Sequence, residues 1–354
     1  MVQYSVQIGE KRRTESRQST LLFISSIAGL IVIFLLIFAF WWSLMPSSIT
    51  ADTSEPLSEQ QQMSAAQIQT DVEYLANTIG ERNMHSSGTM ESTVDFLRER
   101  FESIGYSVED HQYTLRRGMY AGRSATNLVA EIPGSDVHEG IIVIGAHYDT
   151  VAGSPGANDN ASGIAVLLAA AGKMFGYTPR QTIRFVAFAN EEPPFFQTSD
   201  MGSYAYAERS SQRDENITAM IALDGLGYYD NSPGSQSYPL PGLGFAYSDR
   251  ADFIGLVTRV SDLSFLRNIS TGFEEAGVIP TESAALPGFL PGVNWSDHWS
   301  FWKHDYPGML ITDTLLFRDP HYHTPSDTPE RLNYDNMALI TTALVASIKK
   351  MDSE

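Results

Sequence analysis

Residues 145–151, Gly-Ala-His-Tyr-Asp-Thr-Val, continue an apolar run and are followed by Asn-Asp-Asn-Ala-Ser-Gly at residues 158–163. The run, residues 141–144, consists only of isoleucine and valine, which is typical of a buried strand. It stops abruptly at His147 and Asp149. In open α/β sheets, ligands gather outside the carboxyl ends of the strands. The pattern therefore predicts polar chemistry at the end of this strand.

Further strands and helices alternate on both sides of this stretch. The predicted strands cover residues 106–113, 127–132, 140–146, 182–189, 217–223 and 307–312. The first predicted helix begins near residue 66, and the others cover residues 93–104, 161–175, 201–210 and 334–349. Such alternation predicts an α/β three-layer sandwich with a mixed, centrally parallel sheet. Residues 231–244 and 277–292 are rich in Pro, Gly and Ser, so we expect both to be long surface loops.

The composition excludes some classes of function. The chain has 354 residues and a formal charge of −19, which argues against a nucleic-acid partner. It contains no cysteine, so disulfides, thiolate nucleophiles and cysteine-type zinc sites are excluded. Any metal must bind to His, Asp and Glu side chains. No pattern assigns an oligomeric state.

An uncharged segment lies near the N-terminus, where residues 21–42 are rich in Ile, Leu and Phe and end in two tryptophans. At about 1.5 Å per residue, such a helix covers a hydrocarbon core of roughly 30 Å. We expect residues 21–43 to be a transmembrane anchor in the lipid bilayer. A cleaved signal peptide and a buried core helix are the alternatives. The flank at residues 1–20 is basic, which predicts a cytoplasmic N-terminus.

This orientation places the rest of the chain outside the cytoplasm, in the periplasm or the extracellular space. Residues 44–65 are rich in Ser, Thr, Gln and acids and show no apolar periodicity, so we expect a flexible stalk. Residues 66–354 then form one catalytic domain, near the upper size for a single core.

Acids and histidines follow several of the predicted strands. The candidates are His147 and Asp149, Asp159, the pair Glu191 and Glu192, Asp224, and a loop that supplies His321 and His323. Taken singly, each has a structural alternative, such as a helix cap at Asp159 or solvated loop acids at 191 and 192. Together, four strand ends that carry only zinc-type ligands favour a metal site.

Five separated segments with these residues resemble, in order, the co-catalytic zinc exopeptidases typified by bacterial leucyl aminopeptidase. Glutamate carboxypeptidase and glutaminyl cyclase are relatives within that group. The segments are Gly-Ala-His-Tyr-Asp, Ala-Asn-Asp-Asn-Ala-Ser-Gly, Asn-Glu-Glu, Leu-Asp-Gly-Leu-Gly and His-Thr-Pro-Ser-Asp-Thr, starting at residues 145, 157, 190, 223 and 323. The resemblance covers roughly residues 66–350.

The resemblance implies a site for two zinc ions. It assigns His147 and Asp224 to one zinc, Glu192 and His323 to the other, and Asp159 to both. It also implies that His323 binds metal rather than its neighbour His321. Two Zn²⁺ ions carry four positive charges, which three carboxylates and a bridging hydroxide would cancel. A buried site tolerates such a neutral cluster.

The same resemblance implies catalytic and orienting roles for two further acids. Glu191 would be the general base that takes a proton from the zinc-bound water, and Asp149 would orient His147. The family places a Ser-Asp-His segment near the substrate, which corresponds here to Asp297 and His298; a structural role is the alternative. Phe195 and Phe196 directly follow the prolines at 193 and 194. We expect them to form an apolar wall of the substrate pocket, and the alternative is that they pack under the loop.

We therefore expect a membrane-anchored, two-zinc aminopeptidase that hydrolyses N-terminal residues from peptides. Carboxypeptidase and dipeptidase specificities remain open at this stage. The alternatives from other classes are a glutaminyl-cyclase-like acyltransferase with one zinc and a catalytically inactive ectodomain. Retention of all five ligands and Glu191 argues against the inactive ectodomain.

Overall fold

The computed structural model of the chain describes residues 23–30, 32–33, 45–51, 56–86, 88–136, 139–240 and 242–353. The chain divides into two compact units, Met1–Met45 and Pro46–Glu354. The predicted tail at residues 1–20 and most of the predicted anchor at 21–43 lie outside the described residues. None of the described helices has the length and apolar character that a bilayer span requires. The anchor therefore stays a prediction.

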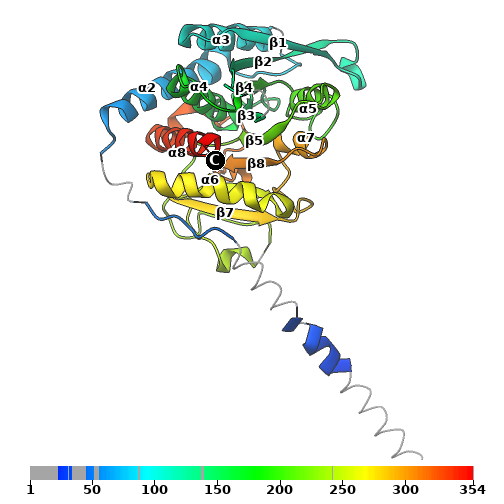
Figure 1. The fold of residues 1–354 in the computed structure, drawn as a ribbon, viewed down its shortest axis with the longest axis vertical. Coiled ribbons are helices and arrows are strands. Elements are labelled where there is room, and N and C mark those ends of the chain that lie inside the picture. The colour runs from blue at the N-terminus through cyan, green and yellow to red at the C-terminus, as the bar shows by residue number, and fades with distance from the viewer. Residues whose placement is uncertain are drawn as a thin grey trace, which may run out of the picture. The chain divides into compact units, whose positions relative to one another are not determined.

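The second unit is built on a mixed sheet, shown in Figure 1 with β1 at the top and β7 at the bottom. Among the described residues, eight strands form this sheet in the order β1-β2-β4-β3-β5-β8-β6-β7. They are β1 (Val108–Thr114), β2 (Ser124–Ile132), β3 (Ile141–His147), β4 (Thr182–Phe188), β5 (Ile217–Leu223), β6 (Ile254–Arg259), β7 (Thr281–Leu286) and β8 (Gly308–Thr312). The central strands β4, β3, β5 and β8 are parallel.

Antiparallel pairs flank this centre. β1 pairs with β2, and β2 with β4, in antiparallel register, while β6 is antiparallel to β8 and parallel to β7. The predicted mixed sheet with a parallel centre is therefore confirmed. Residues 142–147 of β3 are all buried, as expected for a strand that is covered on both faces.

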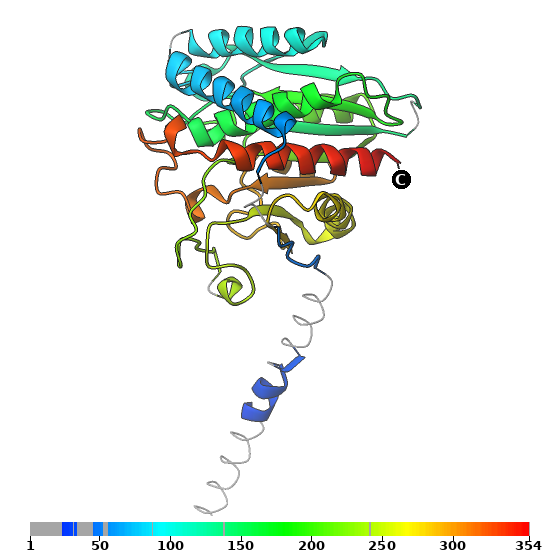
Figure 2. The same ribbon diagram turned by 90° about the vertical axis from the view of Figure 1, so that its left-hand side faces the viewer.

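Helices cover both faces of the sheet. The longer ones are α2 (Glu59–Glu73), α3 (Thr89–Ile104), α4 (Gly163–Met174), α5 (Gly202–Gln212), α6 (Leu263–Ala276) and α8 (Tyr334–Ser353), and α7 (His298–Trp302) is short. Figure 2 looks onto the face covered by α2, α4 and α8, against which α6 also packs. Helices α5 and α7 pack together on the opposite face. The three layers agree with the predicted sandwich.

Helix α4 begins unusually close to strand β5. A Cβ atom added at Gly163 would lie 2.5 Å from the carbonyl oxygen of Leu223, the last residue of β5. Only glycine fits such an approach, because any side chain would clash with the strand. This contact brings residues 157–162, which precede the helix, to the end of β5.

Two predicted boundaries differ from the structure. The predicted loop at 277–292 contains β7, whose sequence Thr-Glu-Ser-Ala-Ala-Leu has low β propensity and is ordered by pairing with β6. The first predicted helix, placed near residue 66, begins earlier in the structure, because α2 starts at Glu59 after a capping box between Ser58 and Gln61. Further upstream in the predicted stalk, Ile49 forms an antiparallel bridge with Thr281.

Candidate metal centre

The predicted metal ligands lie at one edge of the sheet, where the parallel strands end. His147 is the last residue of β3, and Asp224 directly follows β5. Asp159 lies in the turn before α4, and Glu192 follows β4 after a short connection. His323 comes from the loop between β8 and α8. Parallel strands present their carboxyl ends at the same edge, so the topology gathers these side chains.

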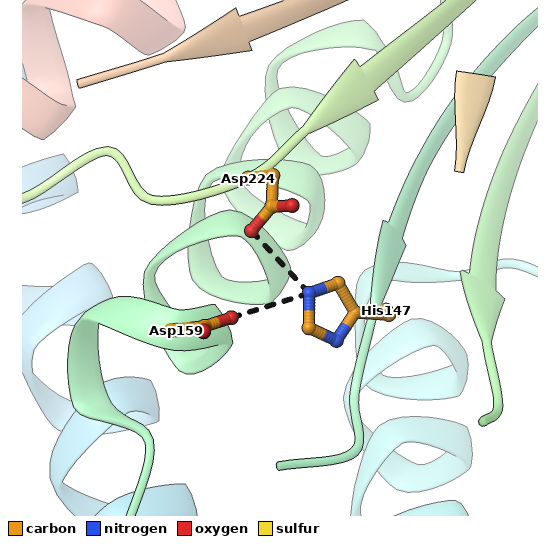
Figure 3. A group of neighbouring side chains, drawn as sticks. All are labelled: His147, Asp159 and Asp224. Atoms are coloured by element: carbon orange, nitrogen blue, oxygen red, sulfur yellow. Dashed lines mark hydrogen bonds and ion pairs between the residues drawn. The ribbon is translucent and has the colours of Figure 1, made fainter. Parts of the chain in front are cut away.

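One group of ligands consists of His147, Asp159 and Asp224 (Figure 3). The Nε2 atom of His147 lies 3.3 Å from Asp159 Oδ1 and 3.3 Å from Asp224 Oδ1. All three residues are buried. The structure thus gives one nitrogen and two carboxylate oxygens that face a common point.

A second group consists of Asp159, Glu192 and His323. The Nε2 atom of His323 lies 3.0 Å from Asp159 Oδ2 and 3.2 Å from Glu192 Oε1. The ring of Tyr322 stacks on His323 with centroids 3.7 Å apart, which limits rotation of the imidazole. Asp159 therefore presents one oxygen to each histidine, which is the arrangement that a carboxylate shared by two metals requires.

The polar atoms of the second group are also arranged to bind a cation rather than to form hydrogen bonds with each other. Glu192 Oε1 and His323 Nε2 are buried, yet neither has a hydrogen-bond partner among the described residues. Their close approach is therefore not aligned as a hydrogen bond. Buried polar atoms without partners are costly, and a divalent cation would satisfy both.

Asp149 contacts the side of the His147 ring that faces away from the ligand group. His147 Nδ1 lies 3.2 Å from the backbone carbonyl of Asp149 and 3.5 Å from its carboxylate. With its hydrogen on Nδ1, the ring leaves Nε2 free to bind metal. The Asp149 carboxylate also accepts hydrogen bonds from the backbone N–H groups of Glu191 and Glu192, at 2.9 and 3.1 Å. One side chain therefore fixes a ligand from β3 and the segment after β4.

Asp327 performs a similar task for the shared ligand. Its carboxylate accepts hydrogen bonds from the backbone N–H groups of Asn158 and Asp159, at 2.7 and 3.1 Å. Asp327 has no predicted role, although it belongs to the fifth family segment, His-Thr-Pro-Ser-Asp-Thr. Its position four residues after His323 was the available signal.

Arg82 is a second positioning residue without a predicted role. It is fully buried, and its guanidinium donates to backbone carbonyls only. These include the carbonyls of Tyr148, Pro155 and Gly156, at 2.8, 2.7 and 2.8 Å. The arginine therefore fixes the backbone of the segment between His147 and Asp159. No motif marks it, since the effect depends on a contact distant in sequence.

Without a cation, the buried cluster favours bound protons. Burial and the neighbouring Asp159 carboxylate raise the pKa of Glu192 to about 8. Burial would lower the pKa of His323, but the carboxylates of Asp159 and Glu192 outweigh it and raise that pKa to about 10. Burial likewise raises the pKa of Glu191 well above its usual range. Divalent cations would displace such protons and lower these pKa values.

A cavity of about 200 Å³ opens over the ligands. Its wall includes Glu191, which belongs to neither ligand group, and Phe196. Of the other predicted pocket residues, Phe195 instead packs against Tyr120, with ring centroids 5.4 Å apart. Asp297 and His298 are fully buried and do not line the cavity. His321 is likewise absent from the ligand groups, and its Nδ1 faces Ser326 at 3.3 Å.

A second, mainly apolar pocket of about 110 Å³ adjoins this cavity. The two share Trp295, Leu315 and Tyr322 as lining residues. The floor of the apolar pocket comes from β6, β7 and β8, and its walls come from the connections around residues 236–247, 291–295 and 314–317. None of these walls was among the predicted pocket residues.

An α/β sandwich with two adjoining groups of His and carboxylate side chains, each able to hold a metal ion, is typical of a metal-dependent hydrolase. Residues 127–348 match the family described as Peptidase family M28. The chain belongs to this family, which confirms the predicted zinc exopeptidase resemblance and the predicted class, a metallopeptidase. The predicted zinc cofactor agrees with the family and with the donor atoms of the two ligand groups.

Individual relatives agree with this membership. The chain is 36% identical over 290 residues to the uncharacterised protein YfbL of Escherichia coli, which covers 80% of this chain and 87% of that protein. It is 26% identical over 242 residues to leucine aminopeptidase 1 of Arthroderma otae, covering 64% of this chain and 57% of that protein.

Solved structures share the fold. LapB from Legionella pneumophila is 23% identical, with a TM-score of 0.63, and the match covers 86% of this chain and 79% of LapB. BSAP, a zinc aminopeptidase from Bacillus subtilis, is 15% identical, with a TM-score of 0.63, covering 80% of this chain and 94% of BSAP. At these identities the likeness concerns the fold.

Proposed function

We propose that the chain is an aminopeptidase that uses two zinc ions to remove N-terminal residues from peptides. The observation that carries this proposal is the shared carboxylate of Asp159, with one oxygen near His147 and the other near His323. Membership in Peptidase family M28 and the similarity to leucine aminopeptidase 1 support the same conclusion.

The residues of the site divide the work of peptide hydrolysis. Two bound zinc ions would polarise the scissile carbonyl and lower the pKa of the attacking water. Glu191 would accept the proton of that water and deliver it to the leaving amine. It suits this role because it lines the cavity beside a ligand without belonging to a ligand group. Asp149 would keep His147 and the backbone of Glu191 in place.

The apolar pocket would bind the side chain of the N-terminal residue. It adjoins the cavity at Trp295 and Tyr322, and its lining is dominated by apolar side chains such as Val257, Ala284 and Leu310. Burial of apolar side chains contributes roughly 25 cal/mol per Å². Large aliphatic and aromatic N-terminal residues should therefore be preferred over alanine.

The full-length chain, purified in detergent and loaded with zinc, provides the direct test. We expect hydrolysis of leucyl p-nitroanilide, no hydrolysis of its N-acetylated form, loss of activity with a chelator and recovery with zinc. Metal analysis should give two zinc ions per active chain. Cyclisation of glutaminyl peptides with a single zinc, and no cleavage of free-amine substrates, would instead support the glutaminyl-cyclase-like function.

We also propose that residues 21–43 anchor the chain in a membrane with the catalytic unit on the extracytoplasmic side. The support is the uncharged run at residues 21–42 and its basic N-terminal flank. Membranes that contain the chain should retain it during alkaline extraction. Protease added to intact cells or spheroplasts should digest the catalytic unit, and a protected unit would contradict this orientation.

A further inference from the structure

The loop that closes the apolar pocket also carries an exposed apolar surface. Residues 239–247, Pro-Leu-Pro-Gly-Leu-Gly-Phe-Ala-Tyr, contain no charge. The loop includes the short helix η4 (Leu243–Phe245), whose last residue, Phe245, is 95% exposed, and Leu240 is 36% exposed. Single exposed apolar side chains are common on protein surfaces, so the position of this loop decides whether Phe245 has a partner.

This loop lies beside the entry of the N-terminal segment into the catalytic unit. The Tyr247 hydroxyl donates to the backbone carbonyl of Ser283 in β7, at 3.1 Å. On the same strand, the Glu282 carboxylate accepts a hydrogen bond from Ser48, and Thr281 pairs with Ile49 through two backbone hydrogen bonds of 2.9 Å. The loop and the segment therefore meet at the outer strand of the sheet, and Figure 1 shows η4 on the β7 side.

The distance from this strand to the proposed anchor is short. Ile49 is seven residues after Trp42, the last of the two tryptophans that end the proposed anchor segment. Seven residues span at most about 25 Å when fully extended. With the anchor ending at residue 42 or 43, the edge of β7 stays within that distance of the membrane surface, so the bilayer is the partner that is always present near the loop.

We propose that Leu240 and residues 242–247 form a second membrane contact, in which Phe245 enters the interfacial layer of the bilayer. The inference rests on the proposed anchor. The loop has the features of an interfacial element, because its aromatic residues suit the headgroup region and no charge has to be desolvated. Asp249 and Arg250 follow it with opposite charges, so the contact should not depend on anionic lipid.

The contact would have a consequence for the active site. Pro239, Leu243 and Tyr247 line the apolar pocket, so the same loop would face the pocket on one side and the lipid on the other. Membrane contact would hold this wall in place and keep the pocket close to the bilayer surface.

The absence of cysteine allows a site-specific test in the full-length chain. The variants Phe245→Cys and Met119→Cys would each carry an environment-sensitive nitrobenzoxadiazole label, in phosphatidylcholine vesicles with and without doxyl-labelled lipid. Met119 is the matched control: it is 82% exposed and lies in η2 (Gly118–Tyr120), between β1 and β2 at the opposite end of the sheet. Cooperative thermal unfolding would show that both labelled variants are folded.

We expect a blue-shifted emission at residue 245 that doxyl lipid quenches several-fold more strongly than at residue 119. Water-like emission at both positions would overturn the inference. A blue shift without lipid quenching would also overturn it, because another protein surface would then cover the loop. Alkaline extraction of the same vesicles separates the two proposals: release of the chain contradicts the anchor, whereas retention with a water-exposed residue 245 contradicts only the loop contact.

Discussion

Four buried aspartates share one local geometry, and two of them position residues of the candidate metal centre. Each carboxylate accepts hydrogen bonds from two successive backbone N–H groups. Asp149 and Asp327 act on segments that carry metal ligands, whereas Asp200 and Asp352 hold turns at Arg116 and Arg180. The same pair of hydrogen bonds that stabilises turns elsewhere in the fold therefore positions the candidate metal ligands at this site.

Asp327→Asn should lower zinc affinity by about 10- to 100-fold, the usual effect of losing a group that orients a ligand. An asparagine removes the negative charge and places an NH₂ group opposite one of the two N–H donors, so Asp159 would lose its fixed position. Isothermal titration with zinc measures the change.

Asp352→Asn is the matched control for this substitution. It also removes a buried carboxylate that clamps two N–H groups, and it should cost about 1–3 kcal/mol of stability. Its zinc affinity should not change. Equal zinc affinities for the two variants would contradict the positioning role of Asp327.

Glu191→Gln should reduce kcat by about 10²- to 10⁴-fold, the range for loss of a general base. Glutamine has nearly the same shape but cannot accept the proton of the attacking water. Two zinc ions should remain bound, because Glu191 belongs to neither ligand group. Activity within a few-fold of the parent, measured on leucyl p-nitroanilide, would remove Glu191 from this role.

At the scale of secondary structure, sequence patterns predict the centre of the sheet better than its edge. Strands β3 and β5 are continuous apolar runs because both of their faces are buried. Strand β7 contains two alanines, a serine and a glutamate, and only its neighbours make it a strand. Strand β6 and helix α6 have no counterpart among the predicted elements, so much of the sheet's second half was missed.

The same division explains how much of the site was predictable. The candidate metal ligands come after central strands and carry chemically distinctive side chains, so the sequence identifies them. The apolar pocket is built from β6, β7, β8 and three connections, and its residues resemble any other core residues. Arg82 could not be predicted, since its role depends on carbonyls brought close by folding.

Ala284→Leu should narrow the apolar pocket from its β7 floor. Ala284 lines the pocket and is 8% exposed, so a larger side chain would fill part of the pocket volume that the substrate side chain would occupy. We expect kcat/KM for leucyl p-nitroanilide to fall by about 10-fold or more, since one lost methylene contact is worth about 1–3 kcal/mol. The alanyl substrate is the internal control. A similar loss for both substrates would contradict the side-chain pocket.

Arg82→Met tests the connection between β3 and the turn that carries Asp159. The loss of a buried charged donor leaves several carbonyls without partners, so the free energy of unfolding should fall by about 3–5 kcal/mol. Arg98→Met is the control, because its ion pair with Asp110 is partly exposed and should be worth about 0–1 kcal/mol. Urea unfolding of both variants measures the two free energies of unfolding. Equal losses of free energy in the two variants would argue against a special role for Arg82.

At the scale of the whole molecule, the metal centre couples folding to pH. Burial raises the pKa of Glu192 from 4.5 to about 8 and those of Asp297 and Asp327 from 3.8 to about 7 in the metal-free chain. Burial opposes protonation of His323, but neighbouring carboxylates raise its pKa from 6.5 to about 10. Each group stabilises the fold when protonated, and this stabilisation is lost as the pH rises from the unfolded to the folded pKa.

The metal-free chain should therefore become less stable between pH 6.5 and pH 8, because folded Glu192 keeps its proton up to about pH 8 and folded His323 up to about pH 10, whereas the unfolded chain releases both at lower pH. Asp297 and Asp327 add to this loss up to about pH 7. His111 and His298 oppose this trend only near pH 6.5, because burial lowers their folded pKa values to about 4 whereas the same rings in the unfolded chain titrate near 6.5. Zinc binds the deprotonated ligands, so its stabilising effect should grow with pH. Thermal unfolding of chelated and zinc-loaded chain across this interval should show a widening difference in Tm. A constant difference, or a metal-free Tm that rises with pH, would mean that the buried acids do not compete with metal for the site.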